Sequence, residues 1–316
     1  MGWQKLGPSF VTDHQRPWMV SHACTPTGLY LPDSDRIRVY FAPRNARGQS
    51  IPTYLEVAAD HPTEVLYLHD RPILELGERG TFDDGGIMPC SLVEAGDGSL
   101  HLYYVGWNPS VSVAYRNAIG LAVSTDGGQT FARPFPGAVV DRNRTEPFFT
   151  ASPCALREGD RWHLWYASST GFLEVEDRIE PLYVLKYATS HDGMDWVRPN
   201  RTLLPPAAPH ECTARPSVVK DGNTYRMWYC YRGSYDYRDG SDAYRIGYAE
   251  SSNPARGWQR MDQRAGIDYS PTGWDSSMQT YPNVVDTPHG RYLFYNGNGF
   301  GKTGIGCARW QDDKHL

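Results

Sequence analysis

One pattern recurs five times along this chain, and a proline marks each copy. The prolines follow one another at intervals of 63, 64, 63 and 66 residues and are Pro26, Pro89, Pro153, Pro216 and Pro282. Each is followed by an apolar stretch, a turn with Gly or Asp, and a second stretch that ends in paired aromatic residues, as in SPCALREGDRWHLWY. A third and a fourth short stretch complete each full unit. Four strands per unit at a long fixed period predict an all-β fold, a five-bladed β-propeller with one blade per repeat.

The last repeat lacks a fourth strand. Its third strand is expected at Thr303 to Trp310, and too few residues follow for another. Residues 2–10, GWQKLGPSF, resemble fourth strands of complete units such as RGWQRM. We therefore expect the last blade to be closed by the N-terminal strand, which removes a free sheet edge. The repeat occupies the whole chain, so residues 1–316 predict a single domain.

Charge and composition exclude several classes of partner. The formal net charge of -5 and the pI near 6.1 provide no basic surface for nucleic acid. No apolar run is long enough to cross a bilayer, and the first residues contain no signal-peptide core. The six cysteines show no CxxC spacing. We expect a cytoplasmic protein that acts on a small molecule or an oligosaccharide and binds neither nucleic acid nor membrane; the sequence leaves the oligomeric state open.

Acidic residues recur five to seven positions before the prolines of the last four repeats. In a propeller the connection entering the innermost strand opens at the axis, so these side chains are expected to surround one axial pocket. Crowded like charges are costly unless a substrate, metal or proton is shared, although single acidic residues in Gly-rich loops also cap turns. The expected axial carboxylates are Asp83, Asp84, Glu146, Glu211 and Asp275. All but Glu211 could supply oxygen ligands for calcium, but no ligand spacing indicates a metal, so no cofactor is predicted.

Loops expected on the same face carry aromatic rings, arginines, amides and histidines. Flat aromatic surfaces beside such groups suit a sugar ring, because its C–H faces stack while its hydroxyls need hydrogen-bond partners. The arginines suit an anionic group on the ligand. The expected substrate-binding residues are His22, Arg44, Trp107, Asn108, His210, Arg215, Arg232, Gln279, Tyr281, Asn296 and Asn298.

With these motifs the chain resembles the five-bladed propellers of glycoside hydrolase families 43, 32, 68 and 130. Glu211 followed by Cys212 is similar to the Glu-Cys pair of the family 32 acid/base, and Glu146 before Pro147 resembles the Arg-Asp-Pro stabiliser of that family. Those families also carry a carboxylate in blade one, which has no counterpart here. The segments FDDGGIMP, EPFFTASP, YRIGYAES and YNGNGFGKTG resemble those of bacterial glycosidase-like propeller proteins.

The resemblance implies a carbohydrate-active enzyme, a glycoside hydrolase-like protein that cleaves or transfers a glycosyl group on a small or anionic sugar. In this interpretation Glu211 is the general acid, Asp84 is the base or nucleophile, and the other three carboxylates orient the pair or bind hydroxyls. One alternative is a lyase, cyclase or transferase acting on an activated sugar or nucleoside, with His22, His210 and Tyr281 as proton-transfer groups. The other alternative is a non-catalytic sugar-binding propeller.

Overall fold

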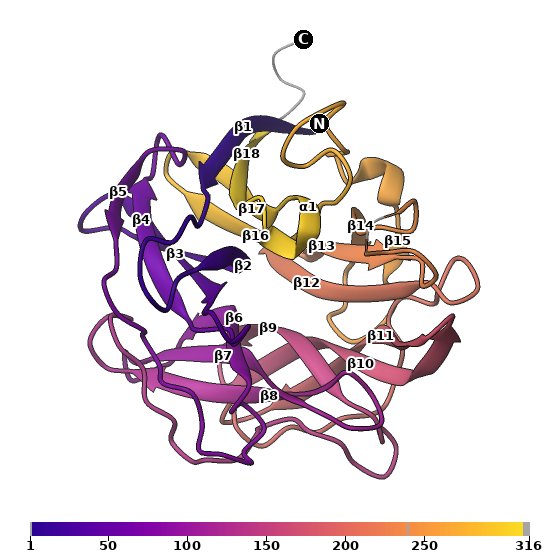
Figure 1. Cartoon of the computed structure of the whole chain (residues 1–316). Helices are drawn as coiled ribbons and strands as arrows, with labels where there is room; N and C mark the ends of the chain where they lie inside the picture. Colours follow the sequence, from indigo (N-terminus) through magenta and orange to yellow (C-terminus); the bar gives the residue numbers. More distant parts are fainter. Residues whose placement is uncertain (1, 239, 312–316) are drawn as a thin grey trace.

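The five repeat prolines lie in the innermost strands of five antiparallel sheets, which surround one axis as the blades of a propeller (Figure 1). The protein is described here from a computed structural model that covers residues 2–238 and 240–311. The predicted all-β, five-bladed propeller is confirmed.

Within each blade the strands run in sequence order from the axis outward, except that the last blade ends with β1. Blade one contains β2 (Ser21–Leu31), β3 (Arg36–Arg44), β4 (Thr53–Ala58) and β5 (Val65–Leu68). Blade two contains β6 (Gly86–Glu94), β7 (Leu100–Pro109) and β8 (Tyr115–Ser124). Blade three contains β9 (Thr150–Glu158), β10 (Arg161–Val175) and β11 (Arg178–Ser190). Blade four contains β12 (Cys212–Asp221), β13 (Thr224–Arg232), β14 (Arg245–Ser251) and β15 (Gln259–Arg260). Blade five contains β16 (Thr280–Thr287), β17 (Gly290–Asn296), β18 (Ile305–Gln311) and β1 (Gly2–Phe10). Two short helices complete the described elements, η1 (Asp262–Arg264) and α1 (Asn298–Gly301).

Blades two and three contain three strands each, so the expectation of four strands in every blade is wrong for them. Their fourth segments are reduced to isolated bridges, such as Val123 with Ala132 and Thr189 with Val197. Pro134 and Pro199 follow these bridges by two residues. Because proline has no backbone N–H to donate, a strand ladder does not continue past these points.

The amino-terminal strand closes the ring, as the incomplete last repeat predicts. β1 pairs antiparallel with β18, with Trp3 opposite Trp310. In Figure 1 the indigo β1 lies beside the yellow β18 at the outer side of blade five. The Trp3 ring is buried and packs edge-on against Trp228 of blade four, with ring centroids 5.3 Å apart. The closing strand therefore also joins blade five to blade four.

Paired aromatic residues on the second strand of each blade fill the spaces between blades. All ten of these side chains are at most 1 % exposed: Tyr40 and Phe41, Tyr103 and Tyr104, Trp165 and Tyr166, Trp228 and Tyr229, and Phe294 and Tyr295. Successive residues of a strand point to opposite faces of its sheet. Each pair therefore packs against both neighbouring blades, which fixes the blades around the axis.

Candidate functional site

A β-bulge interrupts each innermost strand at the repeat proline. The register between the first and second strands shifts at this point in all five blades. The residue just before the proline has a positive φ in four of them: Thr25 at 56°, Ser152 at 50°, Arg215 at 49° and Tyr281 at 56°. A positive φ is unfavourable for any residue other than glycine, so this backbone conformation is held by its surroundings. A β-bulge changes the direction in which the side chains of a strand point. The bulges turn the pre-proline side chains toward the axis.

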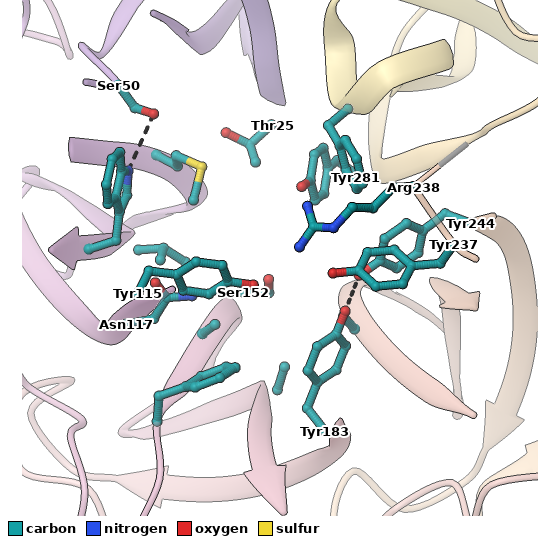
Figure 2. Close-up of a pocket in the computed structure, with 18 of the residues that line it drawn as sticks. Thr25, Ser50, Tyr115, Asn117, Ser152, Tyr183, Tyr237, Arg238, Tyr244 and Tyr281 are labelled. Atoms are coloured by element: carbon teal, nitrogen blue, oxygen red, sulfur yellow. Dashed lines mark hydrogen bonds between the residues drawn. The ribbon is translucent and has the colours of Figure 1, made fainter. Parts of the chain in front are cut away.

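These side chains and the loops joining second to third strands enclose an axial cavity of about 270 Å³. Four of the five pre-proline residues line it, namely Thr25, Met88, Ser152 and Tyr281. Its walls are largely aromatic, made by Trp107, Tyr115, Phe149, Tyr183, Tyr237, Tyr244 and Phe300. Figure 2 shows the tyrosine rings around this space.

Polar side chains also line the cavity, and two of them contain unsatisfied atoms. Nε of Arg44 and Oδ1 of Asn117 are buried without a hydrogen-bond partner. In Figure 2 the guanidinium group of Arg238 points into the cavity. Buried polar atoms normally have partners, so the protein leaves the hydrogen-bonding capacity of these two side chains partly unused.

Two further arginines lie close to the cavity and are almost completely buried. Arg215, the fifth pre-proline residue, donates across the axis to the carbonyls of Cys90 and Pro26 and to Oγ1 of Thr27. Arg232 lies behind the aromatic wall, with its guanidinium carbon 3.7 Å from the ring centroid of Tyr237. Its hydrogen bonds go to carbonyls and hydroxyls only.

The charge around the cavity is therefore positive. Of the four arginines, Arg238 alone pairs with a carboxylate of the described residues, that of Glu180. Glu180 is 2 % exposed; burial by itself raises its pKa, but the hydrogen bonds from Arg238 and Tyr237 bring the pKa below its ordinary value. Nearby, burial and then the charges of Arg44 and Lys302 lower the pKa of His22 to about 4. An anion in this cavity would meet unbalanced positive charge.

None of the five expected axial carboxylates lines the cavity, so their predicted placement is wrong. Three of them instead belong to a unit that repeats within the blades. The second residue of the aromatic pair, a tyrosine, donates to a carboxylate: Tyr104 to Asp83 at 2.9 Å, Tyr166 to Glu146 at 3.0 Å, Tyr229 to Asp262 at 2.6 Å and Tyr295 to Asp275 at 2.9 Å. None of these tyrosines lines the cavity either. We call this arrangement the tyrosine–carboxylate unit.

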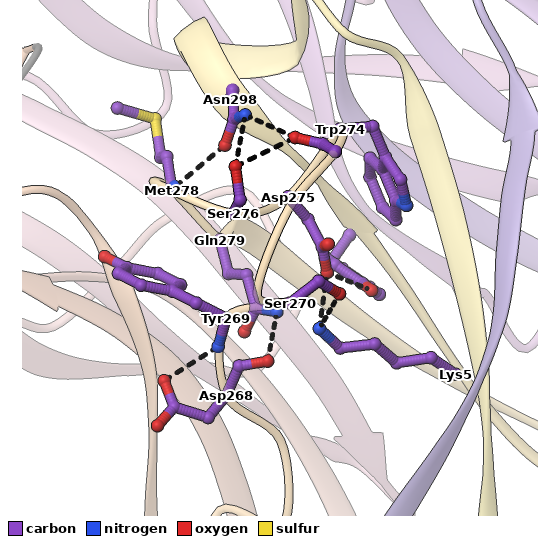
Figure 3. A network of polar contacts seen from close by, with 12 residues as sticks. Lys5, Asp268, Tyr269, Ser270, Trp274, Asp275, Ser276, Met278, Gln279 and Asn298 are labelled. Carbon is purple, nitrogen blue, oxygen red and sulfur yellow. Dashed lines mark hydrogen bonds and ion pairs between the residues drawn. The ribbon is translucent and has the colours of Figure 1, made fainter.

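A cation from the outer segment of the same blade faces each carboxylate of these units. The distances are 2.6 Å for Arg133 to Asp83, 3.8 Å for Arg198 to Glu146, 2.6 Å for Arg260 to Asp262 and 2.6 Å for Lys5 to Asp275. Figure 3 shows Lys5 reaching Asp275 beside Ser270 and Gln279. Blade one lacks an acidic residue before its proline and carries Phe41 where the other blades have the tyrosine. The units thus tie the second strand of a blade to its outer edge.

Glu211 and Asp84, expected as acid and base, are also held away from the cavity. Both carboxylate oxygens of Glu211 accept from Arg260, and Oε1 also accepts from the amide of Ala207. Asp84 accepts from the amide of Gly80 at 2.8 Å, within its own loop. Its other oxygen is buried without a partner.

Of the expected substrate-binding residues, Arg44, Trp107 and Tyr281 line the cavity and the other eight do not. Most of the eight stabilise the surrounding backbone. Asn296 links Thr25, Ala23 and Gly304, Asn298 binds Met278 and Gly273, and Asn108 donates to Thr81. Gln279 donates to Asp268 and Asp275, Ser21 and His22 bond to each other, and the His210 ring packs against Tyr235. Arg215 and Arg232 occupy the buried positions given above, behind the side chains that line the cavity.

Sequence reasoning missed Tyr237, Arg238 and Glu180, as well as the lining residues Thr25 and Ser152. Thr25 and Ser152 were detectable, because they directly precede repeat prolines, the position that faces the axis in every blade. Tyr237, Arg238 and Glu180 do not follow the repeat.

No three His, Cys, Asp or Glu side chains gather into a possible metal site within the described part of the chain. Asp83, Glu146 and Asp275, expected to be able to share calcium, are each bound inside a different blade. No described helix is long and apolar enough to cross a membrane.

Two proteins of Mycobacterium tuberculosis, MT1551 and Rv1502, both described as uncharacterized, are each 37 % identical to this chain over 309 residues, which cover 98 % of this chain and 99 % of each relative. No family model matches the sequence.

Several solved structures have the same fold as this protein. A structure described as a complex of BT0996 and RGII has a TM-score of 0.76 at 15 % identity and covers 98 % of this protein and 92 % of its own length. A thermostable family-43 glycoside hydrolase has a TM-score of 0.66 at 14 % identity and covers 93 % of this protein and 91 % of its own length. A third structure has a TM-score of 0.70 at 13 % identity and covers 100 % of this protein and 95 % of its own length. It is described as one of the GH130 family of mannoside phosphorylases, which contains glycoside hydrolases that target β-1,2 mannosidic linkages. At these identities the likeness establishes the fold alone, that of glycosidase-like five-bladed propellers.

Proposed function

The chain belongs to the same family as the two mycobacterial proteins, and from its cavity we propose that it binds a small anionic sugar at the propeller axis and acts on the glycosyl group of that sugar. The observation that carries the proposal is the composition of the cavity. Aromatic rings form the walls, Arg44 and Arg238 are the charged residues that line it, and no carboxylate of the described residues lines it.

The aromatic walls suit a sugar, because the C–H faces of a sugar ring stack on aromatic rings. The separated polar groups of Ser50, Asn117 and Ser152 suit its hydroxyls, which need individual hydrogen-bond partners. A volume of about 270 Å³ favours one or two rings over a long chain.

The arginines favour a phosphate or carboxylate group on that sugar. Guanidinium groups bind both anions through paired hydrogen bonds. Arg44 is the best candidate for this contact, because it lines the cavity and no described carboxylate lies within ion-pair distance of it. Glycosyl chemistry is supported by the fold, which is shared with the family-43 hydrolase and with the GH130 structure. The lack of a lining carboxylate favours transfer or cleavage of an activated sugar over the two-carboxylate hydrolysis of an ordinary glycoside.

The test is calorimetric binding of three probes that share one ring: a hexose 1-phosphate, the corresponding hexuronic acid and the neutral hexose. We expect the two anionic probes to bind and the neutral hexose to bind at least about tenfold more weakly, since hydrogen bonds to charged groups contribute about 1.5–3 kcal/mol. Arg44→Met should remove that difference, and its removal leaves no carboxylate unpaired.

Arg47→Met is the matched control, because Arg47 lies in the turn that follows Arg44 but is exposed and does not line the cavity. Equal affinity for all three probes, or equal loss of affinity in both arginine variants, contradicts the proposal. Binding of the neutral hexose alone would favour a different, uncharged sugar ligand.

A further inference from the structure

One carboxylate contacts the side chains that line the cavity. Glu180, on β11 of blade three, accepts from Oη of Tyr237 at 2.6 Å and from Nε and Nη2 of Arg238 at 2.9 and 2.8 Å. Tyr237 and Arg238 both line the cavity and follow β13 of blade four. A proton could therefore pass between a bound molecule and Glu180 through a single hydroxyl group.

The contact between Tyr237 and Glu180 does not belong to the repeated tyrosine–carboxylate units. In those units the tyrosine lies on the second strand of a blade, its carboxylate is in the same blade, and the tyrosine is away from the cavity. Tyr237 lies in a loop, its carboxylate partner comes from the neighbouring blade, and its ring forms part of the cavity wall. The stabilising role of the units therefore does not account for this pair.

Resting on the proposed function, we propose that Tyr237 is a catalytic residue of the axial cavity, that it relays a proton from water to Glu180, and that the substrate is a glycosyl phosphate. The direction of the relay follows from the geometry. The Tyr237 hydroxyl donates to Glu180, so a lone pair on the tyrosine oxygen remains free to accept another proton.

The proposed step is a hydrolysis. Water in the cavity gives a proton to Oη of Tyr237, while the proton that Tyr237 held passes to Oε2 of Glu180. The water oxygen forms a bond to the anomeric carbon, and the bond from that carbon to the phosphate oxygen breaks, with its electron pair leaving on the phosphate. Glu180 then returns its proton through Tyr237 to the phosphate. The products are the free sugar and hydrogen phosphate, and the enzyme is restored.

The arginines suit this step because they stabilise the charges that change in it. Arg238 keeps Glu180 ionised, and hence able to accept the proton. The guanidinium of Arg232, 3.7 Å from the Tyr237 ring centroid, favours negative charge developing on that tyrosine. The departing phosphate takes up the proton that Glu180 returns through Tyr237, so the step needs no separate carboxylic acid among the described residues that line the cavity.

The test compares phosphate release from α- and β-hexose 1-phosphates, with calorimetric binding of the same compounds. We expect Tyr237→Phe to lower kcat by about 10²–10⁴-fold, the range for loss of a general base, with affinity retained. Glu180→Gln should lower kcat as well. The Tyr237→Phe/Glu180→Gln double variant should be no slower than Tyr237→Phe alone, because residues that act as one relay are not additive. A purely structural role for Glu180 would instead give a further loss.

Tyr166→Phe is the matched control. It removes a bond between tyrosine and glutamate of the same kind, Tyr166 to Glu146, at a site that does not line the cavity. It should lower the melting temperature and leave phosphate release unchanged. Melting curves of all variants separate loss of folding from loss of chemistry.

The outcomes distinguish the relay from the proposed function. If the protein binds hexose 1-phosphates and releases phosphate, and Tyr237→Phe does not slow that release, the relay is overturned and the proposed function stands. Binding of hexose 1-phosphates without release of phosphate by the unaltered protein also overturns the relay but not the recognition of anionic sugars. Absence of binding to any anionic sugar overturns both.

Discussion

Replacing Lys5 by methionine should destabilise the propeller without affecting the cavity. Lys5, on the closing strand β1, pairs with the fully buried carboxylate of Asp275 at 2.6 Å, and its own side chain is 25 % exposed. Methionine keeps the unbranched stem but removes the charge, so Asp275 retains only neutral hydrogen-bond donors such as Tyr295 and Gln279. The variant thus leaves a buried carboxylate without its cation.

Breaking one partner of a buried ion pair costs about 3–5 kcal/mol, and the partial exposure of Lys5 favours the lower end. At about 2.1 cal/mol/K per residue, unfolding of a chain of this length has an entropy near 0.7 kcal/mol/K, so the melting temperature should fall by about 4–5 °C. Differential scanning calorimetry measures this fall in melting temperature. Adding Asp275→Asn should recover part of the loss, because the unpaired charge is gone.

Gln4→Met is the control, since Gln4 is the exposed neighbour on the same strand. If Lys5→Met melts at the same temperature as Gln4→Met, the stabilising role of this pair is refuted. If Lys5→Met weakens sugar binding at unchanged stability, Asp275 acts at the axis after all.

Two further predictions concern the same units. Burial raises the pKa of Asp275, but its hydrogen bonds bring the pKa below the ordinary value, and the bond from Lys5 contributes most to this. The ionised Asp275 carboxylate therefore stabilises the fold fully above about pH 4, and this stabilisation is lost as the pH falls through the lowered pKa. Melting temperatures measured from pH 6 to pH 3 should thus fall less steeply for Asp275→Asn than for the unaltered protein, and parallel curves would contradict this. Phe41→Tyr should lower the free energy of unfolding by about 1–3 kcal/mol in a denaturant titration, because blade one offers its new hydroxyl no equivalent acidic residue; unchanged stability would show that a partner or water is available there.

The architecture could be predicted from sequence because each repeat carries the same two physical devices. A proline bulge interrupts the innermost strand, and an aromatic pair on the next strand fills the space between blades. Both recur at almost constant spacing, and the missing fourth strand of the last repeat identified the closing strand. The outer ladders of blades two and three were not predicted to end early, although the prolines that end them, Pro134 and Pro199, are present in the sequence.

The site was harder to predict because a regular offset in sequence does not say which way a side chain points. The acidic residues before the prolines do recur, but their partners are tyrosines on the second strand and cations on the outer segment, tens of residues away. One internal comparison pointed to this role: blade one lacks both the acidic residue and the tyrosine, having Phe41 instead. Glu180 and Tyr237 could not be found in this way, since they have no counterparts in the other blades.

The distribution of charge explains why function is expected at the axis and not in the repeats. The carboxylates that recur in blades two to five accept hydrogen bonds from tyrosines and pair with cations, so they stabilise these four blades in the same manner. The pre-proline positions face a common space but differ from blade to blade: Thr25, Met88, Ser152, Arg215 and Tyr281. Because those side chains are free of the repeat, they and the loops beside them can form an asymmetric cavity. Its positive charge arises because arginines enter that space while the carboxylates remain within the blades.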